Sequence, residues 1–428
     1  MSLRPLKNNS GSAILYAVFL MSLLLFISLE IAKDSLIEYQ SAVNSVKRVQ
    51  AYYAAKSCTQ ISLLRIKAYQ QATHSLGKSL PDPSMLDILW QFPLSWPMAI
   101  PTDLSSTNTD DIQKVTKSST FKHQFSSQIS SESGKIDIND LGSPSEGIRN
   151  KTRDQILTLF SAKLLDQSDF SKKYVNFRFD VLLNDMIDWV DSDKVRLEGG
   201  GAEASLYSER RSEYIPPNQP FKTLEELHMV HGMTDEIYDI LAPAITLYGG
   251  KGVNINYADK ATLKGLDRQM TDLVVEQILK RRTDPSLGGP FKDQDDFFGF
   301  IGGLGVNTSD FNEQRIPLYY DFEINFNVSC IGAVGNITRK ITSIVYDFQK
   351  VQSRLKSNLA EDDPNFKKEC KGKTGDEKYE CLCADKTVDD EKKKCLETQK
   401  ANDKKNPDQS GGSSPAAGPP YIIFQDVK

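Results

Sequence analysis

The most constraining feature of this sequence is an uncharged apolar run close to its N-terminus. Residues 12–29 read SAILYAVFLMSLLLFISL, and the polar segment before them carries only two charges, Arg4 and Lys7. At about 1.5 Å of rise per residue, a helix of this length nearly spans a hydrocarbon core of roughly 30 Å. Basic residues before such a run hold that end in the cytoplasm. The chain after Glu30 is therefore expected on the outer side of a membrane.

The residues that flank the run distinguish between three kinds of N-terminal segment. A cleaved secretory signal would have small residues at a cleavage site just after the run. Here the run continues into Leu29-Glu30-Ile31-Ala32-Lys33-Asp34, which reads as helix. The other two alternatives are a plain signal anchor and a type IV prepilin leader. A prepilin leader is cut before the apolar run, here after Gly11, which leaves Ser12 as the new N-terminus.

The helical pattern continues beyond the membrane. Apolar residues recur there at spacings of three and four, as in an amphipathic helix. They are Leu36, Tyr39, Val43, Val46, Val49, Tyr53, Ile61 and Leu64. Neither proline nor glycine interrupts residues 12–76, and Gly77 ends the pattern. We expect one helix, half in lipid and half packed on a soluble domain; a generic membrane-anchored stalk is the alternative.

The rest of the chain alternates between strand-like and helical patterns, which divide it into consecutive parts. Residues 121–130 and 134–140 read as two strands of a hairpin. Early and late strands can form one antiparallel sheet against the long helix, which gives an α+β class with a large all-α domain inserted. The parts are a leader (1–11), a transmembrane helix (12–30), its outer continuation (31–76), a loop and first strands (77–142), an inserted α-helical domain (143–250), a helix-hairpin-helix-like part of it (251–306), returning strands (307–352), a charged insertion and linker (353–420) and a last strand (421–428).

Four of the six cysteines lie in the charged insertion. They are Cys370, Cys381, Cys383 and Cys395. Their CxC core has long arms and no nearby histidine, which fits zinc poorly. Local disulfides are favoured if the segment is exported, although sequence does not decide their pairing. The stretch 353–409 reads as a solvated appendage whose ends meet if 339–348 and 421–427 are neighbouring strands.

Charge and motifs argue against nucleic-acid binding and catalysis. A net charge of -5 gives no general attraction to phosphate backbones. We find no nucleophile–base constellation and expect no enzyme. Residues 253–306 resemble a helix-hairpin-helix unit, so a membrane-anchored periplasmic DNA receptor is the rival function. The acidic residues before the Gly303-Leu304-Gly305 turn repel a phosphate backbone, and the basic cluster Lys280-Arg281-Arg282 reads as a solvated helix end.

Five segments together resemble the general secretion pathway protein K family, the minor pseudopilin K of type II secretion systems. They are the leader with Gly11-Ser12, then GKIDIN (134–139), MIDWVDSDKVRLEGGGAEASLY (186–207), NQPFKTLEELHMVHGM (218–233) and GGKGVNINYADKATLKGL (249–266). The resemblance implies a pilin-like fold at the tip of a periplasmic pilus-like assembly. It also implies I- and J-type minor pseudopilins, the major pseudopilin and an inner-membrane assembly platform as partners. A type IV pilus minor pilin is a related alternative.

The resemblance also gives a meaning to Tyr16, the fifth residue after the proposed cut. Major pilins have there a glutamate that neutralises the N-terminal amine of the subunit above, and this family lacks it. Because an isolated charge in lipid is costly, the neutral Tyr16 suits a tip subunit with no neighbour above. The alternative is that Tyr16 only faces lipid. Ser12 departs from the bulky first residue of the family, and the insertion 353–409 is absent from its pattern.

An acidic, glycine-rich loop lies within the third of these segments. Asp188, Asp191 and Asp193 precede Gly199-Gly200-Gly201, and Glu203 follows it. Calcium takes six to eight oxygen ligands, and the glycines let the chain fold back to gather them. Because relatives in the family bind calcium in this domain, the resemblance implies a Ca²⁺ site. The alternatives are a helix cap for Asp188 and a solvated acidic turn for the whole loop.

Overall fold

The computed structural model describes most of the chain. The described residues are 10–76, 83–97, 118–119, 121, 123–166, 168–207, 216–308, 317–361, 381, 383, 392–397 and 420–428. The leader residues 1–9 and Cys370 lie outside them.

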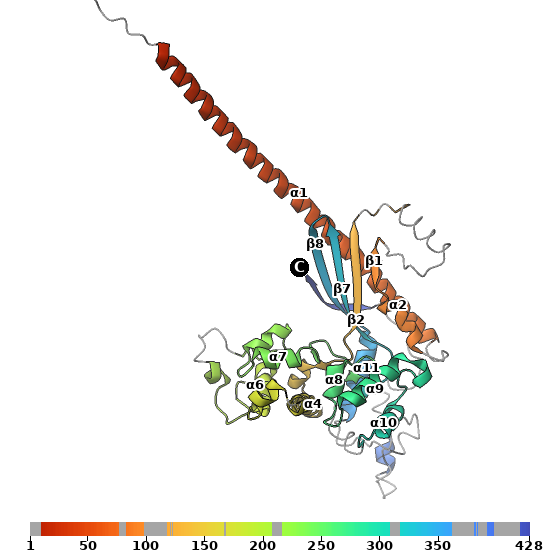
Figure 1. Ribbon diagram of the computed structural model, residues 1–428. Helices are drawn as coiled ribbons and strands as arrows, with labels where there is room; N and C mark the ends of the chain where they lie inside the picture. Colours follow the sequence, from red (N-terminus) through yellow and green to blue (C-terminus); the bar gives the residue numbers. More distant parts are fainter. Residues whose placement is uncertain are drawn as a thin grey trace, which may run out of the picture.

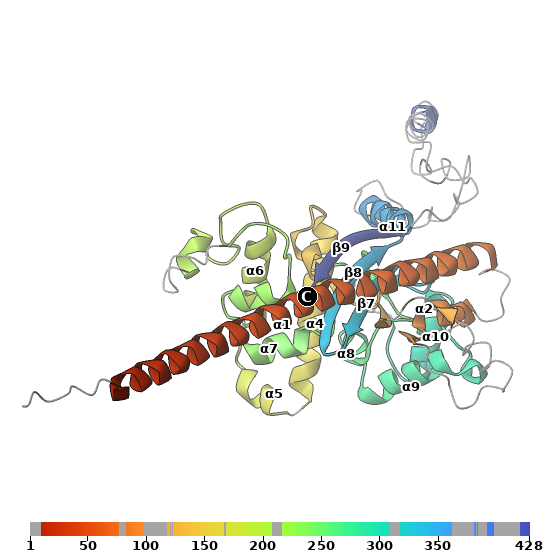
Figure 2. The same cartoon turned by 90° about the horizontal axis from the view of Figure 1, so that it is seen from above.

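One long helix, α1 (Ser10–Leu76), organises the molecule. Its first part protrudes from the body, and its last part crosses the soluble region (Figures 1 and 2). The protruding part is long and apolar enough to cross a membrane, and none of that stretch is buried. The prediction of an uninterrupted helix over residues 12–76 is therefore confirmed.

The distal part of α1 packs on a five-stranded sheet of order β1-β2-β7-β8-β9. Its strands are β1 (Leu94–Trp96), β2 (Gln124–Ser131), β7 (Asn325–Val334), β8 (Ile337–Tyr346) and β9 (Tyr421–Val427). Every neighbouring pair is antiparallel. Alternation in β2 buries Phe125 and Ile129 on the face that α1 covers. The predicted combination of a long N-terminal helix and an antiparallel sheet is thus confirmed.

The contact between α1 and β7 is close because both elements have small residues there. Ala51 and Ala55 are fully buried, and a Cβ added at Gly332 would lie 2.2 Å from the carbonyl oxygen of Ala51. One to two turns further along α1, a disulfide joins Cys58 to Cys330, with their Cα atoms 5.8 Å apart. This disulfide fixes the membrane-anchored helix covalently to the sheet.

Both insertions leave the sheet from the same end. Ser131 of β2 pairs with Phe326, Phe326 with Val345, and Val345 with Ile422 of β9, which makes one row across four strands. The Phe326 ring lies 5.8 Å from the ring of Tyr69, near the distal end of α1. The insertions therefore emerge at the end of the body away from the protruding helix (Figure 1).

Pairing in the sheet tests two of the predictions. The expected pairing of the strand before the charged insertion with the strand after it is confirmed by β8 and β9. The expected hairpin of residues 121–130 with 134–140 is wrong. β2 pairs with β7 instead, and β3 (Ile136–Asp137) pairs in parallel with β4 (Ile245–Thr246). Alternation indicated strands correctly but carried no information about their partners.

The segment between β2 and β7 is mainly helical. Its helices are η2 (Ile138–Gly142), α4 (Glu146–Leu165), α5 (Asp169–Tyr174), α6 (Phe179–Val190), η3 (Glu203–Tyr207), η4 (Leu224–Met229), α7 (Asp235–Leu241), α8 (Lys260–Lys264), α9 (Asp272–Thr283), η5 (Pro285–Leu287) and α10 (Gln294–Gly303). It also holds two parallel pairs, β3 with β4 and β5 (Val253–Asn254) with β6 (Leu318–Tyr319), so it is not purely helical. It has a hydrophobic core separate from that under α1.

Helical pieces also lie outside the inserted segment. The predicted loop 77–118 contains η1 (Pro83–Asp87) and α2 (Ile88–Gln91), which pack beside the distal end of α1. After β8, α11 (Phe348–Glu361) begins the charged insertion. In that insertion Cys383 is bonded to Cys395, and Cys381 is also disulfide-bonded.

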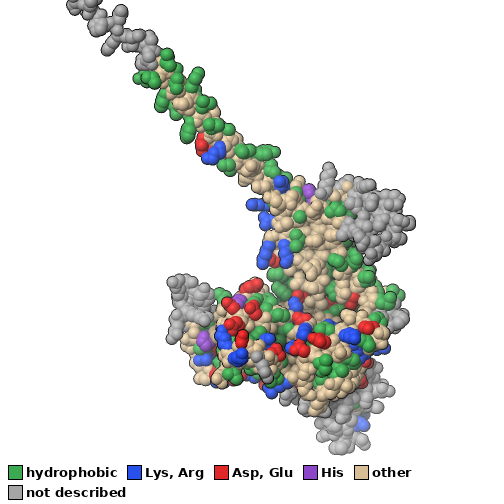
Figure 3. Space-filling model, in the orientation of Figure 1, with side chains coloured by type: hydrophobic (Ala, Val, Ile, Leu, Met, Phe, Trp, Pro, Cys, Tyr) green, Lys and Arg blue, Asp and Glu red, His purple; other side chains and the backbone are tan. Residues whose placement is uncertain are grey.

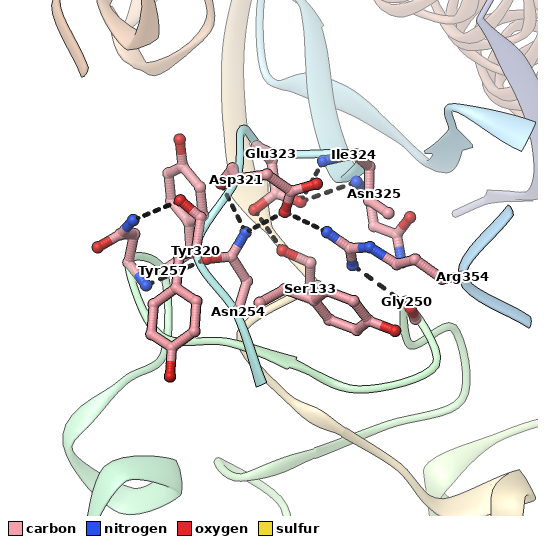
Figure 4. A network of polar contacts seen from close by, with 12 residues as sticks. Ser133, Gly250, Asn254, Tyr257, Tyr320, Asp321, Glu323, Ile324, Asn325 and Arg354 are labelled. Carbon is pink, nitrogen blue, oxygen red and sulfur yellow. Dashed lines mark hydrogen bonds and ion pairs between the residues drawn. The ribbon is translucent and has the colours of Figure 1, made fainter. Parts of the chain in front are cut away.

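A buried polar network joins the inserted segment to the body (Figure 4). The Glu323 carboxylate accepts hydrogen bonds from the backbone N–H of Ile324 and of Asn325, both at 2.8 Å, and from Ser133 Oγ at 2.9 Å. The Glu323 N–H donates to the hydroxyl of Tyr69 on α1 at 3.1 Å. Complete burial raises the pKa of Glu323 to about 7. The network ties α1, the sheet and the insertion to one residue, Glu323.

Candidate functional site

The acidic loop after α6 folds back on itself as a small hairpin. Val195 and Ala202 form an antiparallel bridge, and the Glu203 N–H donates to the carbonyl of Lys194 at 3.3 Å. The turn between them is Gly199-Gly200-Gly201, with φ values of +76°, +66° and +93°. Residues with a side chain rarely adopt this left-handed backbone conformation, which explains why all three positions are glycine. The hairpin returns Glu203 to the end of α6.

This geometry brings three of the predicted ligands together. Ligand oxygens of Asp191, Asp193 and Glu203 lie within 4.8 Å of one another. Oδ1 of Asp191 and Oε1 of Glu203 are buried and have no hydrogen-bond partner within the described part of the chain. Buried carboxylate oxygens without a donor are costly, and a cation would satisfy them. The donor set is entirely oxygen, which suits a hard cation such as calcium.

Asp188, the fourth predicted ligand, lies next to this cluster but is already engaged. It is buried, and its Oδ1 accepts a hydrogen bond from the Leu197 N–H at 3.1 Å. It therefore fixes the start of the hairpin to the last turn of α6, rather than capping the start of a helix.

The acidic groups also destabilise one another in the absence of a cation. The pKa of Asp188 is raised to about 6, mainly by burial and in smaller part by the charges of Asp191 and Glu203, against the Leu197 hydrogen bond. Burial likewise raises the pKa of Asp191, with a contribution from the charge of Asp193. Burial raises the pKa of Glu203 as well. A divalent cation would reverse these shifts because it favours the ionised carboxylates.

A second candidate site is the outer face of α1, and here the sequence prediction is corrected. The apolar stripe beyond the membrane was expected to pack on the soluble domain. Instead its large members are exposed, including Val46 at 57%, Tyr53 at 58% and Leu64 at 66%. The buried face carries small residues around Ala51 and Cys58, and larger ones, Ile66 and Tyr69, only toward its distal end. Figure 3 shows hydrophobic side chains along the protruding part of α1.

The N-terminal residues of interest lie at the start of the same helix. α1 begins at Ser10, so Gly11 and Ser12 fall in its first turn. Tyr16 is 69% exposed on the stretch that is apolar enough to cross a membrane.

The predicted DNA-binding unit is less basic at its surface than its sequence suggests. Arg281 is buried and pairs with Asp296 at 2.6 Å, and its guanidinium lies 4.3 Å from the ring centre of Phe291. Arg282 donates to the carbonyls of Ile255 and Ala258 at 2.6 and 2.8 Å. The prediction of a solvated basic helix end is therefore wrong, because two of its three cations hold the inserted segment together.

A membrane-length helix packed on an antiparallel sheet, with an inserted helical segment, defines a membrane-anchored protein of pilin-like architecture. Residues 134–250, which include the acidic hairpin, match the family model of type II secretion system protein K. The match covers this part of the chain and agrees there with the resemblance that the sequence motifs indicated.

Among solved structures, a chain of the GspK-GspI-GspJ complex from the enterotoxigenic Escherichia coli Type 2 Secretion System is similar. The similarity covers 73% of this chain and 93% of that chain, with 18% sequence identity and a TM-score of 0.47. No curated protein sequence matches this chain.

Proposed function

We propose that this chain is a minor pseudopilin of a type II secretion system. In this proposal α1 anchors it in the bacterial inner membrane with its bulk in the periplasm. It occupies the tip of the pseudopilus, initiates assembly and contributes to protein export across the outer membrane. Its work is contact and assembly rather than catalysis. The match of residues 134–250 to the protein K family supports this role.

The outward apolar stripe of α1 is the observation that carries the proposal. The stripe continues the apolar surface of the membrane segment into the body, on the side of α1 away from the sheet. A contiguous exposed apolar surface on a soluble region marks an interaction site. Helices pack side by side by interlocking such ridges of side chains. The natural occupant is the equivalent helix of another pseudopilin, first of all the I- and J-type minor pseudopilins.

The disulfide between Cys58 and Cys330 supports the periplasmic placement. Both sulfur atoms are fully buried, so the bond is part of the folded body. Disulfides of this kind persist in oxidising compartments and are rare in the cytosol. Tyr16 supports the tip placement, because a neutral side chain there offers no partner to the amine of a subunit above.

The experiment that tests the role combines processing with partner recovery. The tagged full-length chain is expressed with and without a prepilin peptidase, and the mass of its N-terminus is measured. We expect residues 1–11 to be lost only when the peptidase is present. We also expect two other minor pseudopilins to co-purify with the chain. Trimming after Leu29, or recovery of the chain alone, would rule the role out.

We further propose that calcium stabilises the inserted segment by binding Asp191, Asp193 and Glu203, with Asp188 in support. Ligand binding to the native state raises the melting temperature. Protein kept free of other divalent ions should therefore melt lower in chelator and recover on adding Ca²⁺. Glu203→Gln should abolish the response, whereas Glu236→Gln, on the surface of α7, should preserve it. An equal melting temperature with and without calcium would contradict the site.

A further inference from the structure

The helix formed by η1 and α2 presents an apolar stripe to solvent. Met85, Ile88, Leu89 and Phe92 have the spacing i, i+3, i+4, i+7, which places them on one face of a helix. Ile88 is 66% exposed and Phe92 is 54% exposed. An amphipathic helix ordinarily turns such a stripe toward the core. Here the stripe points outward, and the opposite face of the same helix is buried.

The inward face is occupied by a different set of contacts. Trp90 is 3% exposed, and its ring packs edge-on against Tyr69 and Phe326 at centroid distances of 6.3 and 5.5 Å. Its Nε1–H donates to the Asp87 carboxylate at 3.2 Å, and the Tyr257 hydroxyl donates to the same carboxylate at 2.9 Å. These contacts fix which face of the helix points outward.

Arg65 of α1 fixes the end of the same helix. Its guanidinium donates to the carbonyl oxygens of Leu89 and Trp90, both at 3.0 Å, and also to that of Phe92. These carbonyls end the helix and would otherwise need water. A helix held in this way loses little conformational freedom when a partner binds its exposed face, which favours recognition.

The position and charge of the stripe indicate its partner. Residues 83–97 contain one charged residue, Asp87, and it is turned inward. The outer surface of α2 is therefore neutral and suits another apolar surface. Arg65 attaches α2 to α1 through the carbonyl of Leu89. The last residues of the α1 stripe are Ile61, one helical turn before Arg65, and Leu64, next to Arg65 in the chain, so the stripe ends where α2 is attached. The two stripes adjoin at the distal end of α1.

We infer that η1 and α2 form a second docking surface for the minor pseudopilin that lies along α1, through Met85, Ile88, Leu89 and Phe92. This inference rests on the proposed function, because it names where the same partner continues beyond the α1 stripe. The recognition is apolar, by a helix face whose anchors enter a groove of the partner. It extends the interface from the membrane region to the distal end of the body.

Site-specific photocrosslinking in the full-length chain tests both surfaces at once. Benzoylphenylalanine replaces Tyr53 in the α1 stripe, Ile88 or Phe92 in the α2 stripe, and Leu273 on α9 as a control of matched exposure, 67% against 66% for Ile88. The chain is co-expressed with the other minor pseudopilins. We expect adducts with a minor pseudopilin from positions 53, 88 and 92, and none from position 273.

The outcomes separate the two proposals. An adduct from position 53 without any from 88 or 92 overturns the α2 surface and leaves the proposed function standing. No adduct from any of the three positions, with no co-purified partner, overturns both. Adducts from position 88 only with a secreted protein, with a second copy or within the chain also overturn the inference.

A matched pair of variants adds a quantitative readout. Ile88→Ser with Phe92→Ser should reduce the minor pseudopilin recovered with the chain by at least about fivefold, because buried aromatic and aliphatic anchors dominate interfaces. Leu273→Ser should leave recovery unchanged. Both proteins should keep the wild-type melting temperature, since the substituted residues are exposed. Wild-type recovery by the double variant would contradict the inference.

Discussion

The two faces of α1 differ in side-chain size, and hydrophobicity alone would predict the wrong face to be buried against the sheet. The face on the sheet carries Ala51, Ala55 and Cys58, all fully buried. The opposite face carries Val46 and Tyr53, both more than half exposed. Over residues 46–58 the larger and more hydrophobic side chains are thus outside and the small ones are in the core, whereas large side chains are buried only further along, at Ile66 and Tyr69.

This difference shows that residue size can decide which face of a helix meets a sheet. Small side chains let the backbones of α1 and β7 approach until a Cβ at Gly332 would clash with α1. Close approach brings many atoms into dispersion contact, although each side chain is small. The large apolar residues stay exposed, and the proposed function assigns them to packing against another molecule. On that proposal the buried face determines stability and the exposed face determines association, and variants can test each separately.

Removing the disulfide should have the largest effect on stability. Cys58→Ala with Cys330→Ala releases a cross-link between residues separated by 272 positions. The expected loss is about 2–5 kcal/mol of unfolding free energy, because the unfolded chain regains its freedom. Urea unfolding in detergent micelles, followed by tryptophan fluorescence, measures it.

The disulfide in the charged insertion provides the control for this variant. Cys383 and Cys395 are separated by 12 positions, and their bond lies outside the sheet. Cys383→Ser with Cys395→Ser should leave unfolding of the body near its wild-type midpoint. A loss equal to that of the Cys58–Cys330 variant would show that the covalent link from α1 to the sheet has no special role.

Glu323 should give the second largest effect, as a dependence of stability on pH. Its pKa in the fold is about 7, raised by burial above its ordinary value of 4.5. Between these values the folded protein holds a proton that the unfolded chain releases, so stability falls as pH rises through this window. From about pH 4.5 to 7 the unfolding free energy should fall by about 3 kcal/mol.

Glu323→Gln isolates this contribution. The amide oxygen can still accept from the Ile324 and Asn325 N–H groups but does not ionise. The variant should therefore lose the part of the fall in unfolding free energy between pH 5 and 8 that Glu323 contributes, when it is compared with wild type in matched buffers. Glu225→Gln, at an exposed position, should follow the wild-type profile. A slope unchanged by Glu323→Gln would contradict the prediction.

Gly332→Ala tests close packing directly. The added Cβ meets backbone atoms of Ala51 and Ala55, which cannot rotate away, so α1 must shift from the sheet. Overpacking of this kind costs about 1–3 kcal/mol. The melting temperature measures the loss, and Gly302→Ala on α10, where the new Cβ meets nothing within 4 Å beyond its own stretch of helix, is the matched control. Equal melting temperatures for the two variants would show that α1 has room to move.

The fold was predictable where local pattern decides it. The uninterrupted helix follows from the absence of Gly and Pro over residues 12–76, and β8 and β9 follow from alternating strands on either side of a charged stretch. Pairing between distant segments was not predictable in the same way. Neither Cys58 nor Cys330 has a sequence neighbour that identifies its partner, and β2 pairs with a strand almost two hundred residues later in the chain.

The acidic site was predictable as a set of residues because glycines mark the turn that gathers them. Asp191, Asp193 and Glu203 come together through the Gly199–Gly201 turn, a signal present in the sequence. The orientation of α1 on the sheet was not predictable, because a helical stripe of apolar residues has the same sequence pattern whether it packs on a core or on a partner. The composition of the other face of α1 indicates which side packs on the sheet, because Ala, Cys and Ser on one face of a helix allow close helix–sheet contact.

The smallest effect on stability is expected where the effect on association is greatest. Tyr39, Val46 and Tyr53 recur every seven residues, so they lie on one side of α1, away from the sheet. Val46→Ser with Tyr53→Ser removes exposed apolar surface only, and the unfolding free energy should stay within about 0.5 kcal/mol of wild type. Recovery of the other minor pseudopilins should nevertheless be lost. Leu165→Ser with Val175→Ser, at residues 65% and 66% exposed on the inserted segment, is the matched control and should retain them. If the α1 variant unfolds early and still binds its partners, the exposed face is part of the core and the contrast between the two faces is wrong.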